Sequence, residues 1–169
     1  LKAVLAPALI AAVGVVLSLI GIFMVKTKED AGMKQLLAAL SRGTNIASIL
    51  IAVATFAIFA WLFGTETNQW WQVSLSVVVG LLSGVIIGKS TEYYTSQTYK
   101  PTQKVSESAQ TGPATVIISG MGLGMLSTAI PVVTVGVAIV LSYLCANGFV
   151  IEMNAESLSM GLYGIGIAA

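Results

Sequence analysis

The sequence contains no histidine and only one cysteine, Cys145, among its 169 residues. Protein zinc sites are built largely from these two residue types, so the composition argues strongly against a zinc site. A single cysteine cannot form a disulfide within the chain, and it therefore says nothing about the redox compartment.

Charged residues are also scarce. They make up 9% of the chain, against roughly 25% in an ordinary soluble domain, and the net charge is +1. Because the chain has no large positive charge and no basic tract interleaved with aromatic residues, nucleic acid is excluded as an expected partner. Apolar residues reach 56%, and the mean hydropathy is +0.92. This composition is typical of a protein embedded in a lipid bilayer.

The apolar residues form long runs separated by short polar breaks. A helix needs about 20 mainly apolar residues to cross the hydrocarbon core of a bilayer. We therefore predict an all-α, polytopic helical membrane protein, a single membrane-embedded segment over residues 1–169 with four transmembrane helices and the start of a fifth. The predicted spans are residues 3–25, 44–63, 70–88, 112–145 and, truncated, 158–169. The fourth is longer than one crossing needs, so it should project, tilt or bend near Pro131, and residues 33–40 are expected to form a short interfacial helix.

The basic residues favour one orientation in the membrane. All of them except Lys2 fall in two predicted loops, residues 26–43 and 89–111: Lys26, Lys28, Lys34, Arg42, Lys89, Lys100 and Lys104. The alternate loops, around Glu66 and Glu152, contain no lysine or arginine. Cytoplasmic loops carry the excess of basic residues, so we predict that residues 26–43 and 89–111 are cytoplasmic.

Small residues recur at every fourth position on two of the predicted spans. In lipid, such spacing lets two helix backbones approach closely and gain dispersion contacts. The candidate packing residues are Gly80, Gly84 and Gly88, with Ser76 one turn earlier, and Gly120 and Gly124. The contact could lie within one subunit or between subunits, and both alternatives stay open. Serine and threonine residues inside the spans are expected to form interhelical hydrogen bonds.

No nucleotide site or ion path is evident in the sequence. The run from Gly84 to Ser90 resembles a phosphate-binding loop, but Ser83 replaces its first glycine, and the backbone N–H groups of a membrane helix are already bonded. No Asp, Glu, Lys or Arg lies deep inside a predicted span, although such a charge usually marks a transport path. The gate of any ion pump would therefore lie outside this chain.

Glu92, Tyr93 and Tyr94 follow the third predicted span, close to Lys89. They could form an interfacial anchor, with the tyrosines at headgroup depth and the lysine extending its ammonium to water. Alternatively, Glu92 could place a carboxylate at a cytoplasmic entrance. The residues alone leave both interpretations open.

Several motifs from about Gly80 onward resemble those of the membrane-integral, ion-pumping inorganic pyrophosphatases, whereas residues 1–63 match only in hydropathy. The longest is the nine-residue run Gly88-Lys89-Ser90-Thr91-Glu92-Tyr93-Tyr94-Thr95-Ser96. At matching spacing it is followed by Tyr99-Lys100-Pro101, Thr111-Gly112, Ala114-Thr115-Val116-Ile117-Ile118, Gly122-Leu123-Gly124-Met125 and Leu162-Tyr163-Gly164-Ile165-Gly166-Ile167-Ala168-Ala169.

The resemblance implies a homodimeric enzyme of the prokaryotic cell (inner) membrane, each subunit a bundle of about sixteen helices that satisfy their own backbone groups in lipid. Such enzymes hydrolyse pyrophosphate at a cytoplasmic site rich in Mg²⁺ and move Na⁺ or H⁺ out of the cytoplasm. This chain would be a central fragment, with outer helices seven to ten and the start of inner helix eleven. The pumped ion and any K⁺ requirement stay open.

The resemblance assigns no catalytic, cofactor-binding or metal-binding residue to this chain. Neutralising a diphosphate with several Mg²⁺ ions requires a dense cluster of carboxylates, and the seven acidic residues here are scattered. The family's acidic motifs are expected elsewhere in the enzyme. We therefore expect an outer-ring scaffold that is inactive by itself.

The sequence begins at Leu1 without a methionine and stops at Ala169 inside an apolar run, so we expect the middle of a longer protein. Two alternative functions remain. A secondary transporter would show broken helices or charges at the membrane midplane. A non-catalytic membrane scaffold would need neither feature.

Overall fold

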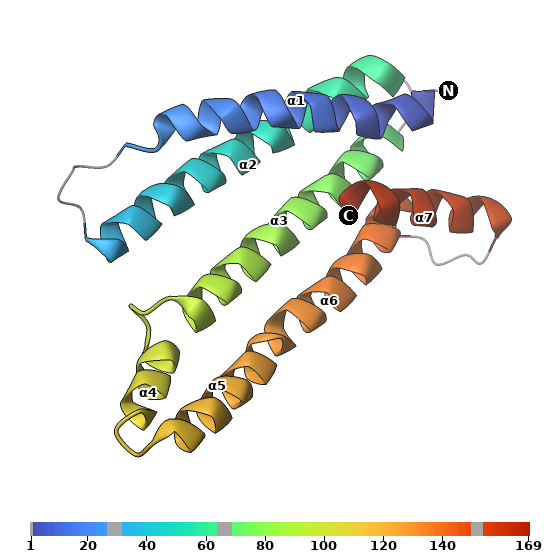
Figure 1. Cartoon of the computed structure of the whole chain (residues 1–169). Helices are drawn as coiled ribbons and strands as arrows, with labels where there is room; N and C mark the ends of the chain where they lie inside the picture. Colours follow the sequence, from blue (N-terminus) through green and yellow to red (C-terminus); the bar gives the residue numbers. More distant parts are fainter. Residues whose placement is uncertain (1, 27–31, 64–68, 150–153) are drawn as a thin grey trace. The chain divides into compact units, whose positions relative to one another are not determined.

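The computed structural model describes residues 2–26, 32–63, 69–149 and 154–169. Within these ranges all regular secondary structure is α-helical, which confirms the predicted fold class (Figure 1). The helices of the described part are α1 (Lys2–Met24), α2 (Met33–Phe63), α3 (Gln69–Thr95), α4 (Lys100–Ser108), α5 (Pro113–Ser127), α6 (Ala129–Ala146) and α7 (Ala155–Ala168).

Four helical stretches are long and apolar enough to cross a bilayer: Val4–Phe23, Met33–Leu62, Trp70–Ser108 and Pro113–Ala146. A shorter apolar helix covers Ser157–Ala168. The four long apolar helices expected from the sequence are thus confirmed, while the bounds of the spans and the start of a fifth span stay predictions. The cytoplasmic assignment of the loops stays a prediction, and three residues used for it, Lys28, Glu66 and Glu152, lie outside the described residues.

Two helices extend further than the hydropathy predicted. The expected interfacial helix over residues 33–40 and the second span form one continuous helix, α2. Gly43 does not end this helix, since a glycine inside a helix costs only about 1 kcal/mol relative to alanine. Likewise α3 continues beyond Gly88 to Thr95, and α4 occupies part of the expected loop 89–111. Hydropathy marks where a helix leaves the apolar layer, whereas backbone hydrogen bonding decides where it ends.

The long fourth run is interrupted between α5 and α6 at Thr128. Pro131 has no N–H group, so it cannot bond to the carbonyl of Ser127 four residues earlier. Helix α6 begins at Ala129, and the N–H of Val132 donates to the Thr128 carbonyl at 3.1 Å. The irregularity expected near Pro131 is therefore confirmed as a break in the helix.

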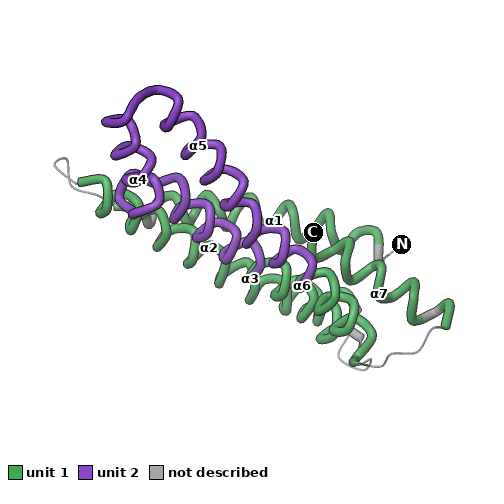
Figure 2. Tube along the Cα trace, turned by 90° about the horizontal axis from the view of Figure 1, so that it is seen from below, with its two compact units in different colours: residues 1–82, 138–169 green, residues 83–137 purple. Residues whose placement is uncertain are grey.

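The chain divides into two compact units, residues 1–82 with 138–169, and residues 83–137 (Figure 2). Helices α3 and α6 contribute one part to each unit. We call these the larger and the smaller unit.

In the larger unit, α1 packs closely against α2 (Figure 1). A Cβ atom placed on Gly21 of α1 would lie 3.0 Å from the Ala47 Cβ and 3.3 Å from the Gly43 carbonyl oxygen of α2. A Cβ on Gly43 would in turn meet the Val25 side chain and lie 3.3 Å from the Gly21 oxygen. The absence of side chains at both glycines is what allows the two backbones to approach.

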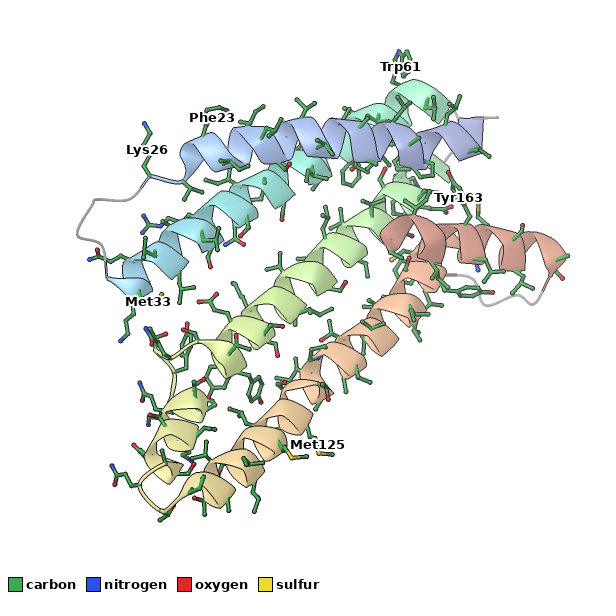
Figure 3. The ribbon with its side chains drawn as sticks, viewed as in Figure 1. Phe23, Lys26, Met33, Trp61, Met125 and Tyr163 are labelled. Atoms are coloured by element: carbon green, nitrogen blue, oxygen red, sulfur yellow. The ribbon has the colours of Figure 1, made fainter. Side chains whose placement is uncertain are left out.

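The apolar core of the larger unit joins four helices. Its fully or nearly buried members are Ala6 of α1, Phe59 of α2, and Val73 and Val77 of α3. Partly buried side chains of α7, among them Tyr163, pack against this group (Figure 3). The beginning of the fifth predicted span is thus attached to the helices that precede it.

Large apolar side chains also face outward. Phe23, Trp61 and Met125 are 81%, 80% and 77% exposed, and they extend away from their helices (Figure 3). Water would make such exposure unfavourable, whereas lipid tails or further helices cover it at no cost. These surfaces fit a multi-pass integral membrane protein.

Candidate functional site

The motif residues Gly88 to Tyr94 form turns of α3 near its C-terminal end, not a loop. The Thr91 hydroxyl donates to the Ile87 carbonyl at 2.9 Å, so it is satisfied within the helix. The Ser90 side chain is only 8% exposed, and its hydroxyl has no hydrogen-bond partner among the described residues. The motif residues thus lie within a helix, and their role stays a prediction.

Three tyrosines gather around this end of α3. The ring centroids of Tyr93 and Tyr94 lie 5.2 Å apart with an interplanar angle of 81°, and those of Tyr93 and Tyr99 lie 5.3 Å apart. The Tyr99 hydroxyl donates a long hydrogen bond of 3.5 Å to the Glu92 carboxylate. Such an arrangement of aromatic rings and one carboxylate is compatible with an anchor at headgroup depth, and the role of Glu92 stays a prediction.

Side-chain hydrogen bonds attach α4 to the elements on both sides of it. The Thr102 hydroxyl donates to the Tyr94 carbonyl of α3 at 3.1 Å. The Thr115 hydroxyl of α5 lies 2.9 Å from the Ser108 carbonyl of α4 and 2.7 Å from that of Gly112, so its single proton serves both. Gly112 has a φ of 135°, a conformation that favours glycine and allows the sharp turn from α4 into α5.

A pocket of about 460 Å³ opens at this corner of the smaller unit. We call it the α4 pocket; it is lined by Tyr93, Tyr94, Lys100, Pro101, Lys104, Val105, Ser119, Gly122, Leu123 and Leu126. None of these residues is acidic. Lys100 and Lys104 are four positions apart on α4 and therefore share one face of that helix. The α4 pocket combines a basic wall with an apolar wall.

The α4 pocket was not predicted from the sequence. Lys100 and Lys104 were used only for orientation, although their spacing beside Pro101 was an available sign of one basic helix face. The apolar wall comes from Leu123 and Leu126 of α5, and no sequence pattern relates them to the two lysines.

A second polar contact joins α3, α6 and α7 in the larger unit. The Ser76 hydroxyl donates to the Ser142 carbonyl at 3.0 Å, and the Ser142 hydroxyl donates to the Gly164 carbonyl at 2.9 Å. Both serine side chains are almost fully buried. The expectation of interhelical hydrogen bonds is confirmed for these two serines, whereas Thr55 and Ser74 bond to carbonyls of their own helices.

The predicted packing glycines differ in their surroundings. At Gly80, a Cβ atom would collide with the backbone carbonyl of Ala168 in α7. At Gly84, Gly88, Gly120 and Gly124, no described atom lies within 4 Å of the Cβ position. Packing at these four glycines stays a prediction that concerns partners outside the described residues.

Other close-packed glycines were missed. Gly21 and Gly43 allow α1 to approach α2, while Gly161 faces the ring of Tyr143 and Gly164 faces Ala146. The spacing of Gly43 and Ala47 is a small-xxx-small pattern that could have indicated the first contact. Gly161 follows Ser157 by four positions and Gly164 precedes Ala168 by four, so the same pattern was available there as well.

The described residues do not fit a magnesium–diphosphate site. Among them, no group of three or more His, Cys, Asp or Glu side chains is placed to hold a metal ion. Several carboxylates would be needed to hold Mg²⁺ ions on a diphosphate. The absence of catalytic and metal-binding residues from this chain stays a prediction.

Comparison with known proteins gives consistent matches along the whole chain. The family described as inorganic H⁺ pyrophosphatase matches residues 1–169. A protein of Bacteroides thetaiotaomicron, provisionally named a K⁺-stimulated pyrophosphate-energized sodium pump, is 62% identical over 168 residues, covering 99% of this chain and 22% of that protein. A Clostridium tetani protein with the same provisional name is 36% identical over 169 residues, covering 99% of this chain and 23% of its own length. A Methanosarcina mazei protein, named a K⁺-insensitive pyrophosphate-energized proton pump, is 34% identical over 168 residues, with coverages of 99% and 23%.

This chain spans less than a quarter of the length of these relatives. The match nevertheless leaves no part of the chain uncovered, and the four long apolar helices are those of a multi-pass membrane protein. The chain belongs to the membrane-integral inorganic pyrophosphatase family.

Proposed function

We propose that this chain is part of a membrane-bound pyrophosphatase that couples hydrolysis of pyrophosphate to phosphate with export of Na⁺ or H⁺. The observation that carries the proposal is the family match over residues 1–169. The arrangement of long apolar helices supports it, because ion export requires a protein that crosses the bilayer.

Within that enzyme, the chain acts as outer-ring scaffold. Its described contacts are those of helix packing, such as the serine hydrogen bonds among α3, α6 and α7. The catalytic carboxylates and the Mg²⁺ ions that they hold belong to the remaining helices, since a diphosphate needs several metal ions around it. The functional form is a homodimer in the cell membrane of a prokaryote, with the remaining helices of each subunit completing the bundle.

Na⁺ is the favoured cargo, and K⁺ is a favoured activator. The support is the 62% identity to the relative named as a K⁺-stimulated sodium pump, against 34% for the relative named as a K⁺-insensitive proton pump. The proton is the second candidate, because both kinds of relative match nearly the whole chain.

The test is pyrophosphate hydrolysis in inverted membrane vesicles that contain the product of the entire reading frame. Activity should require Mg²⁺ and rise with Na⁺ and K⁺, and it should drive ²²Na⁺ uptake that a protonophore does not abolish. Uptake of protons without Na⁺ uptake would establish the second candidate. Folded protein without hydrolysis would refute the proposal and favour a secondary transporter, for which the helix break at Thr128 is the one supporting feature of the described part, or a scaffold.

A further inference from the structure

We propose that the α4 pocket binds the headgroup and upper acyl chains of an anionic phospholipid. None of its lining residues is acidic, which suits a negatively charged headgroup.

The charge distribution in the pocket matches such a lipid. Lys100 and Lys104, both exposed, supply two ammonium groups on one face of α4. Tyr94 and Ser119, which each carry a hydroxyl group, belong to the same lining. Two lysines without a lining carboxylate form a site for a phosphate that bears a negative charge, and basic pockets beside transmembrane helices bind such headgroups.

The remaining lining distinguishes a lipid from a free anion. Val105, Leu123 and Leu126 contribute apolar surface, and Leu126 is 57% exposed. A free phosphate would leave this surface uncovered, whereas the glycerol backbone and upper methylenes of a phospholipid would bury it. The pocket thus offers positive charge to a headgroup and apolar surface to acyl chains, as binding of a phospholipid requires.

The location of the pocket is also that of a headgroup site. Tyr93, Tyr94 and Tyr99 cluster beside it, and tyrosine is enriched at membrane interfaces, which favours a position of the pocket at headgroup depth. The two lysines lie on the side predicted to be cytoplasmic, where anionic lipids attract basic residues next to a membrane helix. Because hydrogen bonds already attach α4 to α3 and α5, the walls of the pocket need little ordering on binding.

The experiment is native mass spectrometry of the detergent-solubilised full-length protein, titrated with palmitoyl-oleoyl phosphatidylglycerol or with the matching phosphatidylcholine. The test variant is Lys100→Gln/Lys104→Gln. The control variant, Lys26→Gln/Lys34→Gln, removes the same charge from the other predicted cytoplasmic loop, outside the pocket lining. Thermal unfolding of each variant shows that it is folded, and Lys104→Gln alone replaces the double variant if that one does not fold.

The wild type should bind at least one phosphatidylglycerol more tightly than phosphatidylcholine. The test variant should lose about 30-fold in affinity for that phosphatidylglycerol and the control less than about threefold, given the strength of lysine–lipid attraction at a membrane surface. Lys100→Arg/Lys104→Arg should retain the affinity, because it keeps both charges. Equal affinity in the wild type and the test variant, an equal loss in the control, or no preference for the anionic lipid would each overturn the proposal.

Discussion

The contact between Gly164 and Ala146 gives the sharpest test of how α7 is attached. In Gly164→Ala, the new methyl group would collide with the Ala146 Cβ and would lie 3.2 Å from the Ser142 carbonyl oxygen. Inserting a methyl group into a close-packed contact costs about 1–3 kcal/mol. If α7 moves away to relieve the collision, the Ser142–Gly164 hydrogen bond is weakened as well, at about 0.6 kcal/mol for an average interhelical bond in a membrane. Since alanine is about 1 kcal/mol more favourable than glycine within a helix, the expected net loss of stability is about 1.5 kcal/mol.

The assay is the midpoint of SDS-induced unfolding of the full-length protein in mixed micelles, followed by circular dichroism. In the double variant Ala146→Gly/Gly164→Ala, the new methyl group at position 164 is present, but the Ala146 methyl group with which it would collide is removed. It should be more stable than the sum of the single changes predicts, with a coupling energy above about 0.5 kcal/mol. Additive effects of the two substitutions would refute the contact, and with it the attachment of α7 described above.

Three further predictions concern the same helices. Gly80→Leu should lower the yield of monodisperse full-length protein in size-exclusion chromatography, because its side chain would meet the Ala168 backbone; an unchanged yield would contradict the α3–α7 contact. Ser142→Ala should cost only about 0.6 kcal/mol in the SDS assay, since one interhelical hydrogen bond is lost, and a loss above about 2 kcal/mol would show that this bond does not account for the role of the serine. Glu92→Gln should leave pyrophosphate turnover within a few-fold of the wild type, because a neutral amide can still accept a hydrogen bond from Tyr99; near-complete loss in folded protein would favour a role at a cytoplasmic entrance.

Hydropathy predicted the long apolar helices but not the helix ends. Residues 44–63 were identified as a span because apolar length is a property of consecutive residues. The continuity of the helix from Met33 into the second span and the end of α3 at Thr95 were missed, because polar residues continue a helix as readily as apolar ones once its hydrogen bonds are formed. The break near Pro131 was predictable, since the missing N–H group acts locally.

The sequence identified some of the glycines that pack against another helix, but not their partners. The glycine stripe predicted a close approach, but only Gly80 of its members meets another helix within the described residues. The approach of Gly21 to Gly43 follows a similar rule and was not recognised, because small residues are frequent throughout this chain. Spacing identifies which residues can pack, whereas the partner depends on the surrounding helices.

The sequence by itself determined that this protein is helical, that it crosses the membrane, and to which family it belongs, since composition, apolar length and motif spacing are all carried along the chain. The tertiary structure alone decided that Ser76 bonds to Ser142, 66 positions away, and that lysines of α4 share a pocket with leucines of α5. The physical reason is that apolar transfer into lipid acts on each residue almost independently of its sequence-distant neighbours. Packing, hydrogen bonding between helices and pocket formation instead require particular side chains to meet in space.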